Sequence, residues 1–181
     1  MPVKIAAILL LAGSSALVSP AFAAMTLTSS DITDGAAIAT AQIYPRCGGQ
    51  NLSPQLGWSG VPAATKSLAL TMIDLDVKPS QWSHWIVVDL PPETTALARG
   101  VSTLPAPAKS VVSNFGAAGY AGPCPPKGTG AHRYRFTIWA LPAATVSIGN
   151  DEKATEVNAA LAKIALDKAS LTGTVISVTV H

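Results

Sequence analysis

Five side chains that can bind an ion or exchange a proton stand at the ends of apolar, strand-like runs. They are Asp74, Asp76, His84, His132 and Tyr134. The two aspartates follow the run at 66–73, the first histidine opens the run at 84–90, and the second histidine and the tyrosine open the run that includes 133–141. Because a buried charge is unfavourable unless it is paired or hydrogen-bonded, we expect the three strand ends to meet, with the aspartates beside the imidazoles.

Strand alternation predicts which residues share the face of each of these groups. The predicted faces are Leu68, Leu70 and Met72 leading to Asp74 and Asp76; His84, Ile86, Val88 and Leu90; and His132, Tyr134, Phe136, Ile138 and Ala140. Arg133 and Arg135 fall on the opposite face of the last strand, where we expect a solvated sheet surface. Each apolar face becomes polar at one end, as the floor of a pocket does.

A loop rich in proline and glycine, at 119–128, leads into the last of these strands. Proline fixes φ and removes a hydrogen-bond donor, and glycine lets two backbone segments approach closely. We therefore expect this loop to form a stiff wall rather than a flexible connection.

Seven motifs, in this order, resemble the phosphatidylethanolamine-binding protein (PEBP) family, in particular its bacterial, Raf-kinase-inhibitor-like branch. They lie at 51–58, 66–70, 74–76, 84–85, 90–91, 114–116 and 119–136, so the resemblance covers nearly all of the chain after about residue 26. The family has a β-sandwich core with a small anion pocket at one end. By motif position, the resemblance implies that the five side chains surround this pocket and that Gly122 and Pro123 lie in its wall.

Two departures from the family pattern limit what the resemblance implies. The family commonly has Asp-Pro-Asp-Ala-Pro where this chain has Asp74-Leu75-Asp76-Val77-Lys78-Pro79, which keeps both carboxylates but relaxes the turn that holds them. The eukaryotic members that bind kinases carry additional C-terminal helical structure, whereas here the strand-like run 174–180 comes last. We therefore do not expect kinase regulation.

The sequence after residue 23 indicates a single, mainly β domain at 24–181, because short apolar runs are broken by Pro, Gly, Asn and Ser. The expected architecture is a PEBP-like antiparallel β-sandwich with one main helix in the C-terminal region and short peripheral helices. The main helix is predicted at 150–171, capped by Asn150 and followed by Gly173. Strands are predicted at 66–73, 84–90, 133–141 and 174–180, with weaker candidates at 25–27, 37–43, 55–58 and 110–112.

Three kinds of chemistry are compatible with two aspartates, two histidines and a tyrosine. An anion receptor would use imidazole N–H, phenol O–H and backbone N–H donors, with carboxylates behind the imidazoles. A carboxylate facing the ligand would repel phosphate but hold the ammonium of a phosphoethanolamine head group, so a zwitterion matches the set better than a simple anion. Two histidines and a carboxylate could instead hold a metal, but no His-x-His or His-Glu-x-x-His spacing supports that alternative.

Hydrolysis is the third alternative, and it lacks a nucleophile beside a base. Ser83 adjoins His84, but alternation sends their side chains to opposite faces, and Gly-x-Ser-x-Gly is absent. We therefore expect a non-catalytic binding protein without cofactor or metal, whose ligand is a phosphorylated small molecule or a phospholipid head group. The alternative is a protein-interaction module that inhibits a protease or another enzyme, and the sequence does not separate the two.

The N-terminal residues 1–23 have the order of a cleavable secretory signal. Lys4 is followed by the apolar run 5–11, then Pro20, and the small residues Ala21 and Ala23 flank Phe22 before the expected cut. An uncleaved anchor is the alternative, although the apolar run is short for a span of about 20 residues. We expect an exported protein, periplasmic in a double-membraned bacterium, with no stable membrane insertion after cleavage.

The formal charge is +2, from 12 Lys and Arg against 10 Asp and Glu, and no basic run occurs. This balance argues against a nucleic acid as the partner and against strong attraction to anionic membranes. A homodimer or a protein target is compatible with it.

Cys47 and Cys124 are the only two cysteines, an even count that suits a disulfide in an oxidising compartment. The bond would tie the loop at 47–50 to the proline-rich wall. On the loop-entropy model, closing so long a loop contributes up to about 4–5 kcal/mol. Two free thiols are the alternative, and a zinc site is disfavoured because there is no Cys-x-x-Cys spacing.

Overall fold

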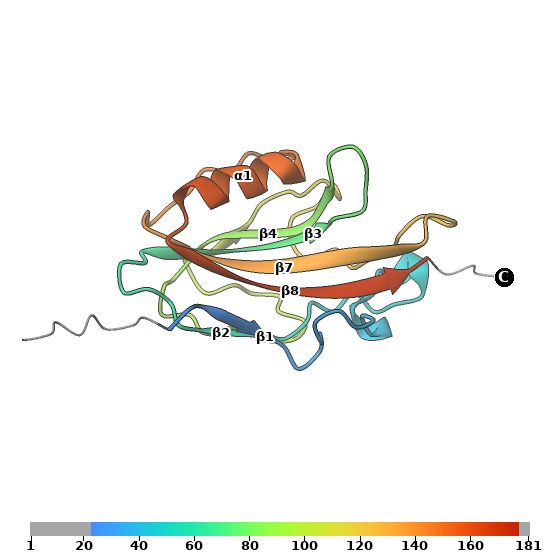
Figure 1. The fold of residues 1–181 in the computed structure, drawn as a ribbon, viewed down its shortest axis with the longest axis horizontal. Helices are drawn as coiled ribbons and strands as arrows, with labels where there is room; N and C mark the ends of the chain where they lie inside the picture. Colours follow the sequence, from blue (N-terminus) through green and yellow to red (C-terminus); the bar gives the residue numbers. More distant parts are fainter. Residues whose placement is uncertain (1–22, 178–181) are drawn as a thin grey trace, which may run out of the picture.

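Two antiparallel sheets and one helix lie in three layers in the computed structural model, which describes residues 23–177 (Figure 1). The five-stranded sheet has the order β6 (Lys109–Ser110), β4 (Trp82–Leu90), β3 (Ser67–Asp74), β7 (Ala131–Leu141) and β8 (Asp167–Ile176). The three-stranded sheet has the order β1 (Thr26–Thr28), β2 (Leu56–Ser59) and β5 (Ala96–Leu97). Helix α1 (Ala154–Ile164) covers the outer face of the larger sheet, and the short 3-10 helices η1 (Thr40–Gln42) and η2 (Pro45–Cys47) are peripheral. The predicted mainly β sandwich is confirmed.

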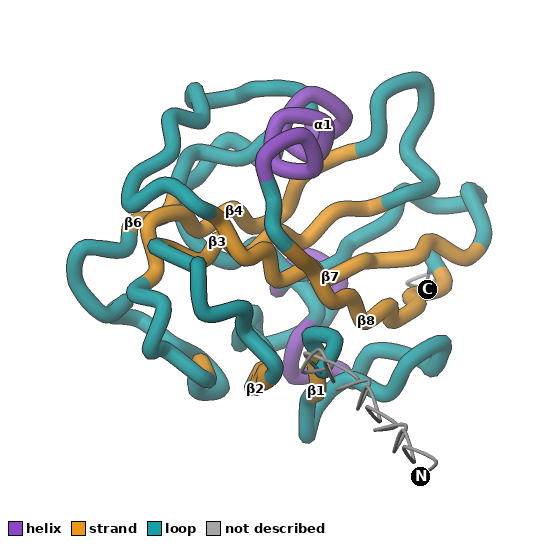
Figure 2. The backbone as a smooth tube through the Cα atoms, turned by 60° about the vertical axis from the view of Figure 1, so that its left-hand side comes forward, coloured by secondary structure: helices purple, strands orange, loops and turns teal. Residues whose placement is uncertain are grey.

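The main core lies between the two sheets. Alternate residues of β3 and β7 point into it, and the predicted faces of these two strands are confirmed: Leu68, Leu70 and Met72 on β3, and Tyr134, Phe136, Ile138 and Ala140 on β7. A second core lies between the larger sheet and α1, where Trp139 and Leu141 meet Val157 and Leu161. Figure 2 shows the helix and the small sheet on opposite sides of the five-stranded sheet.

The predicted face of β4 is wrong, because two β-bulges interrupt its alternation. Pairing with β3 shifts register between Met72 and Ile73, which makes His84 an extra residue, and shifts again before Leu90. Between the bulges, Ile86 and Val88 pack under α1, while Trp85, Val87 and, beyond the second bulge, Leu90 pack in the main core. A bulge re-aims side chains locally, so His84 does not share the face of the residues that follow it at even spacing.

The predicted helix at 150–171 is too long at both ends. Helix α1 starts after Lys153, and the Asn150 side chain instead accepts a hydrogen bond from the Val112 N–H at 3.2 Å. The helix ends at Ile164, and β8 begins at Asp167 and pairs with β7 along its whole length. Gly173 is therefore a strand residue, where a Cβ would meet the Ile38 side chain at 2.5 Å.

Most of the remaining strand predictions are confirmed, and one is wrong. The strands at 66–73, 84–90 and 133–141 correspond to β3, β4 and β7, and the candidates at 25–27, 55–58 and 110–112 overlap β1, β2 and β6. The candidate strand at 37–43 is wrong, because this segment makes an isolated bridge at Ala37 and then forms η1. The strand at 174–180 belongs to β8 up to Ile176. Residues 1–22 of the expected signal and residues 178–181 lie outside the described residues.

Candidate ligand pocket

A cavity of about 270 Å³ opens where β3, β4 and β7 end against the 115–126 region. Its volume suits a small molecule. Aromatic rings, proline and one carboxylate line it: Asp74, Val77, Trp82, His84, Phe115, Cys124, Pro125, Pro126 and Tyr134. Three of the five side chains expected at the strand ends therefore line one cavity.

A larger hollow of about 360 Å³ lies elsewhere, between Trp85, Val101 and Tyr120. Its ionisable groups are already occupied, because Lys109 pairs with Asp89 at 3.3 Å and the Tyr120 hydroxyl donates to the Gln42 carbonyl at 2.9 Å. The smaller cavity is the better candidate for a specific ligand, because polar groups with unused hydrogen-bonding capacity face it.

The hydroxyl of Tyr134 is the clearest of these groups. The side chain is fully buried, and among the described residues its Oη atom has no hydrogen-bond partner. Burial, reinforced by the nearby Asp74 charge, raises the pKa of this phenol, so the group stays protonated. A buried polar atom without a partner is uncommon in a folded protein. Tyr134 lines the cavity next to the Asp74 carboxylate, and its O–H is a donor that no hydrogen bond of normal geometry uses.

His84 has one ring nitrogen committed to the backbone. Its Nδ1 lies 2.9 Å from the Ala121 carbonyl oxygen, and because a carbonyl only accepts, Nδ1 carries the proton. Burial lowers the pKa of the His84 imidazole, so the neutral ring has a lone pair on Nε2. The ring stacks edge-on against Tyr134 at 5.2 Å and tilts against Phe115 at 5.3 Å.

Asp74 and His132 form the expected carboxylate–imidazole pair. Asp74 Oδ2 lies 2.7 Å from His132 Nδ1, and both side chains are buried. The other carboxylate oxygen accepts the Asp76 backbone N–H at 2.9 Å. Asp74 reaches the cavity, whereas His132 lies behind it and supports the carboxylate.

The second nitrogen of His132 contacts the exposed Thr129 hydroxyl at 2.9 Å. The same hydroxyl donates to the Pro126 carbonyl at 2.7 Å. Since a hydroxyl has one proton, Thr129 Oγ1 accepts from His132 Nε2–H when it donates to Pro126. His132 thus joins Asp74 on one side of its ring to Thr129 on the other.

Asp76 does not partner an imidazole as the sequence suggested. It accepts hydrogen bonds from the Arg133 backbone N–H at 2.8 Å and guanidinium at 2.7 Å. These bonds lower the pKa of the Asp76 carboxyl to about 2. Asp76 lies beyond the end of β3, where strand alternation no longer sets its direction. Arg133, expected on a merely solvated face, is the partner that the sequence analysis missed.

Gly122 and Pro123 support the cavity wall from behind. The Gly122 N–H donates to Asn51 Oδ1 at 2.7 Å, and the Pro123 carbonyl accepts the Tyr44 N–H at 3.0 Å. A Cβ on Gly122 would lie 2.2 Å from the Gln42 carbonyl oxygen, so only glycine permits this approach. The wall surface itself is formed by the next three residues, 124–126.

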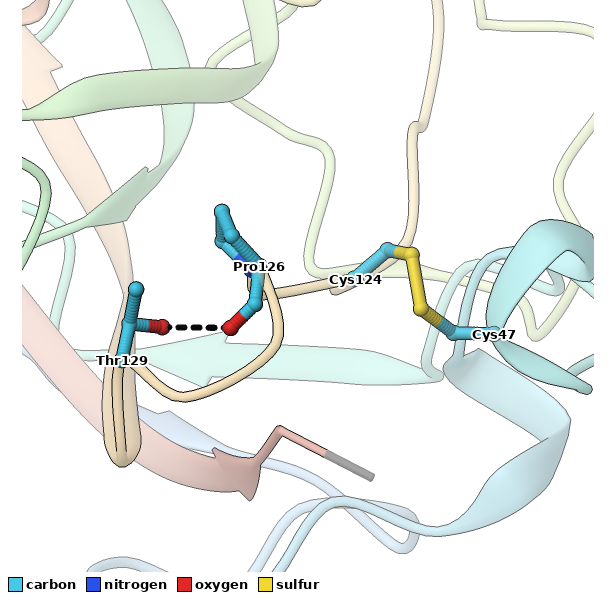
Figure 3. Close-up of a disulfide and its surroundings, with 4 residues drawn as sticks. All are labelled: Cys47, Cys124, Pro126 and Thr129. Carbon is cyan, nitrogen blue, oxygen red and sulfur yellow. Dashed lines mark hydrogen bonds between the residues drawn. A yellow bond between two sulfur atoms is a disulfide. The ribbon is translucent and has the colours of Figure 1, made fainter. Parts of the chain in front are cut away.

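The predicted disulfide between Cys47 and Cys124 is present, with a Cα–Cα distance of 5.5 Å. It joins η2 to the wall, and Figure 3 shows it at the opposite end of the loop segment from the bond between Thr129 and Pro126. Because Cys124 also lines the cavity, the covalent link fixes a residue that a ligand would touch.

Some pocket residues were missed by the sequence analysis. Phe115 belonged to a recognised motif and Trp82 is close to His84 in sequence, so both carried a signal. Thr129 carried none, because its contact with His132 depends on how the loop folds back. Within residues 23–177, no group of three or more His, Cys, Asp or Glu side chains could hold a metal ion. No helix in the same range is long and apolar enough to cross a membrane.

A sandwich of two sheets with a small aromatic and carboxylate-lined pocket at one end defines the class of this protein. The family model described as phosphatidylethanolamine-binding protein matches residues 28–176. The chain therefore belongs to the PEBP family.

Relatives and solved structures agree with this assignment. UPF0098 protein YbcL of Escherichia coli K12 is 39% identical over 137 residues, which are 71% of this chain and 75% of that protein. Its crystal structure, described as that of a member of the mammalian PEBP family, has a TM-score of 0.79 at 34% identity and covers 87% of this chain and 100% of that chain.

Two further relatives come from other bacteria. LppC of Mycobacterium tuberculosis H37Rv, whose name calls it a lipoprotein, is 38% identical over 156 residues, 86% of this chain and 74% of that protein. The PEBP homologue CT736 of Chlamydia trachomatis has a TM-score of 0.69 at 34% identity, covering 84% of this chain and 97% of that chain.

Proposed function

We propose that this is an exported binding protein whose pocket holds the phosphate end of a phosphoethanolamine-type ligand and does not convert it. The proposal depends on Tyr134, which lines the cavity and whose fully buried hydroxyl makes no hydrogen bond to the described residues. A phosphate oxygen would accept from this hydroxyl, and hydrogen bonds to a charged acceptor are among the stronger ones in proteins.

His84 provides the second contact in this proposal. While the His84 ring is neutral, its Nε2 atom presents a lone pair to a binding anion. An anion at this position favours the protonated ring. It therefore raises the pKa of His84 in the complex, whereas burial lowers this pKa in the free protein. Ligand binding would then be coupled to the uptake of a proton, which turns Nε2 into a donor.

The carboxylate of Asp74 and the rings of Trp82 and Phe115 suit the other end of a zwitterion. Asp74 is the charged residue among the cavity-lining side chains, and it would repel a ligand made only of negative charge. An ammonium group is attracted both to a carboxylate and to aromatic faces. A phosphoethanolamine head group therefore matches the lining better than inorganic phosphate does.

Binding without conversion is supported by the surroundings of the Thr129 hydroxyl. Asp74, His132 and Thr129 have the order of a hydrolase triad, in which the imidazole must accept the proton of the nucleophile. Here the Thr129 hydroxyl does not line the cavity, and it donates to the Pro126 carbonyl at 2.7 Å, which directs its proton away from His132 Nε2. Export is supported by the signal-like N-terminal residues 1–23 and by the relative named as a lipoprotein.

Calorimetry with phosphoethanolamine, inorganic phosphate and ethanolamine tests the proposal. Wild type should bind phosphoethanolamine more tightly than either fragment. Tyr134→Phe removes one donor to a charged acceptor, worth roughly 1.5–3 kcal/mol, so affinity should fall about tenfold or more. Tyr44→Phe is the matched control, because the Tyr44 ring packs on Phe115 at 4.8 Å without lining the cavity. Equal affinities of wild type and Tyr134→Phe would place the ligand elsewhere.

A further inference from the structure

We propose that Thr129 is a positioning residue of the pocket, because its hydroxyl fastens the Pro126 wall to the buried Asp74–His132 pair. Thr129 does not line the cavity; it would act on the ligand only through the residues that do. The inference rests on the proposed function of the pocket, since it concerns the shape of that site.

The contacts form one continuous path from the loop to the sheet. The turn at 126–129 is closed twice. The Thr129 hydroxyl donates to the Pro126 carbonyl at 2.7 Å (Figure 3), and the Thr129 backbone N–H donates to the same oxygen at 3.3 Å. Nε2 of His132 lies 2.9 Å from the Thr129 hydroxyl, and Nδ1 of His132 lies 2.7 Å from Asp74 at the end of β3. One hydroxyl thus joins an exposed turn to a buried strand end.

Side-chain packing does little to hold this turn. Gly128 and Gly130 flank Thr129 with φ of +79° and +83°, and a Cβ built on either would meet nothing within 4 Å. The turn is therefore loosely packed at these two positions, and hydrogen bonds contribute to fixing its conformation. The hydroxyl of Thr129 is the group at which two of these bonds meet.

The other end of the wall is held independently. The disulfide fixes Cys124, and the Asn51 amide fixes Gly122. Pro125 and Pro126, which line the cavity, lie between these anchors and Thr129. Loss of the hydroxyl would therefore remove the side-chain contact between this end of the wall and His132, and the prolines would be held less closely relative to Tyr134 and His84.

Thr129→Val and Thr129→Ser separate the hydroxyl from the bulk of the side chain. Valine keeps the branched shape and removes both hydrogen bonds, whereas serine keeps the hydroxyl. Thr26→Val is the matched control, because Thr26 is also exposed and its hydroxyl bonds to Ser59 at 2.8 Å in the small sheet.

Two measurements decide the outcome: calorimetry with phosphoethanolamine, and hydrogen exchange of the backbone amides at 127–130. Thr129→Val should weaken binding about three- to tenfold and speed exchange in this segment, while its unfolding temperature matches that of Thr26→Val. Thr129→Ser should restore affinity to within about twofold of wild type.

Unchanged exchange in Thr129→Val would overturn the inference whether or not a ligand binds. Faster exchange with unchanged affinity would overturn it too, because the wall would then not shape the site. If wild type binds no phosphoethanolamine, the proposed function fails on its own. Exchange at 127–130 would still decide whether Thr129 holds the wall.

Discussion

Ligand binding should strengthen as the pH falls, because His84 takes up a proton with the ligand. In the free protein, burial lowers the pKa of His84; the Ala121 carbonyl and the Asp74 charge oppose this shift, and His132 reinforces it. An anion at Nε2 raises the pKa in the complex. Between the two pKa values, one proton is bound per ligand, so the affinity should rise by up to about tenfold for each pH unit removed.

The assay needs a ligand that does not titrate in the same range. O-sulfoethanolamine carries the same ammonium group as phosphoethanolamine, and its sulfate stays singly charged from pH 8 to pH 5.5, whereas the phosphate of phosphoethanolamine titrates in this range. Calorimetry from pH 8 to pH 5.5 in buffers of different ionisation enthalpy would measure both the affinity and the number of protons taken up. His84→Gln is the informative variant, because glutamine offers an uncharged N–H donor that does not titrate. The affinity of the His84→Gln variant for O-sulfoethanolamine should be nearly independent of pH.

The same shift makes a prediction about stability without ligand. The unfolded chain protonates its histidines near pH 6.5, above the lowered pKa of folded His84. The unfolded state therefore binds more protons below this pH, and the contribution of His84 should destabilise the fold as the pH falls from 7 to 5. The loss of stability between pH 7 and pH 5 should be smaller in His84→Gln. Parallel pH profiles of affinity for wild type and His84→Gln would refute the assignment of the proton to His84.

Two further predictions concern residues around the pocket. Asp76→Asn should reduce stability by less than about 1 kcal/mol, since its partner Arg133 is 57% exposed to solvent. The same variant should keep ligand affinity within about twofold of wild type. Thermal unfolding and calorimetry check the two expectations, and a tenfold loss of affinity would mean that Asp76 does face the ligand. Reduction of the Cys47–Cys124 bond should destabilise the protein by up to about 4–5 kcal/mol and weaken binding, because Cys124 lines the cavity. Intact mass without reductant should show no alkylatable thiol; two modified cysteines would count against the bond.

The regular alternation of side chains between the two faces of a strand made the core-facing residues of β3 and β7 predictable from the sequence. Both strands keep one face in the main core from end to end, so the apolar period of two led directly to Asp74 and Tyr134. The pairing of Asp74 with His132 followed from the unfavourable burial of an isolated charge. Local pattern and simple electrostatics were sufficient for these residues.

Other features depended on contacts that a single sequence does not display. The segment after α1 begins with residues compatible with a helix, at 165–171, but pairing with β7 made it a strand. Asp76 lies beyond the end of its strand, and a turn brought it to Arg133. Thr129 reached His132 only because the loop folds back, and neither residue type nor spacing indicates that return.

The bulge on β4 lets the strand carry the histidine of the pocket as one residue more than its partner needs. Trp82 pairs with Asp74 on one side of the bulge, and Trp85 pairs with Met72 on the other. Because side chains alternate with a period of two, a chain without His84 would present Trp82, Ser83 and Trp85 as consecutive residues of a regular strand, with the same partners and on the same faces as now. The ladder between β3 and β4 therefore does not require His84, whereas the pocket does. The position can change its side chain, and so the chemistry of the pocket, within an intact scaffold.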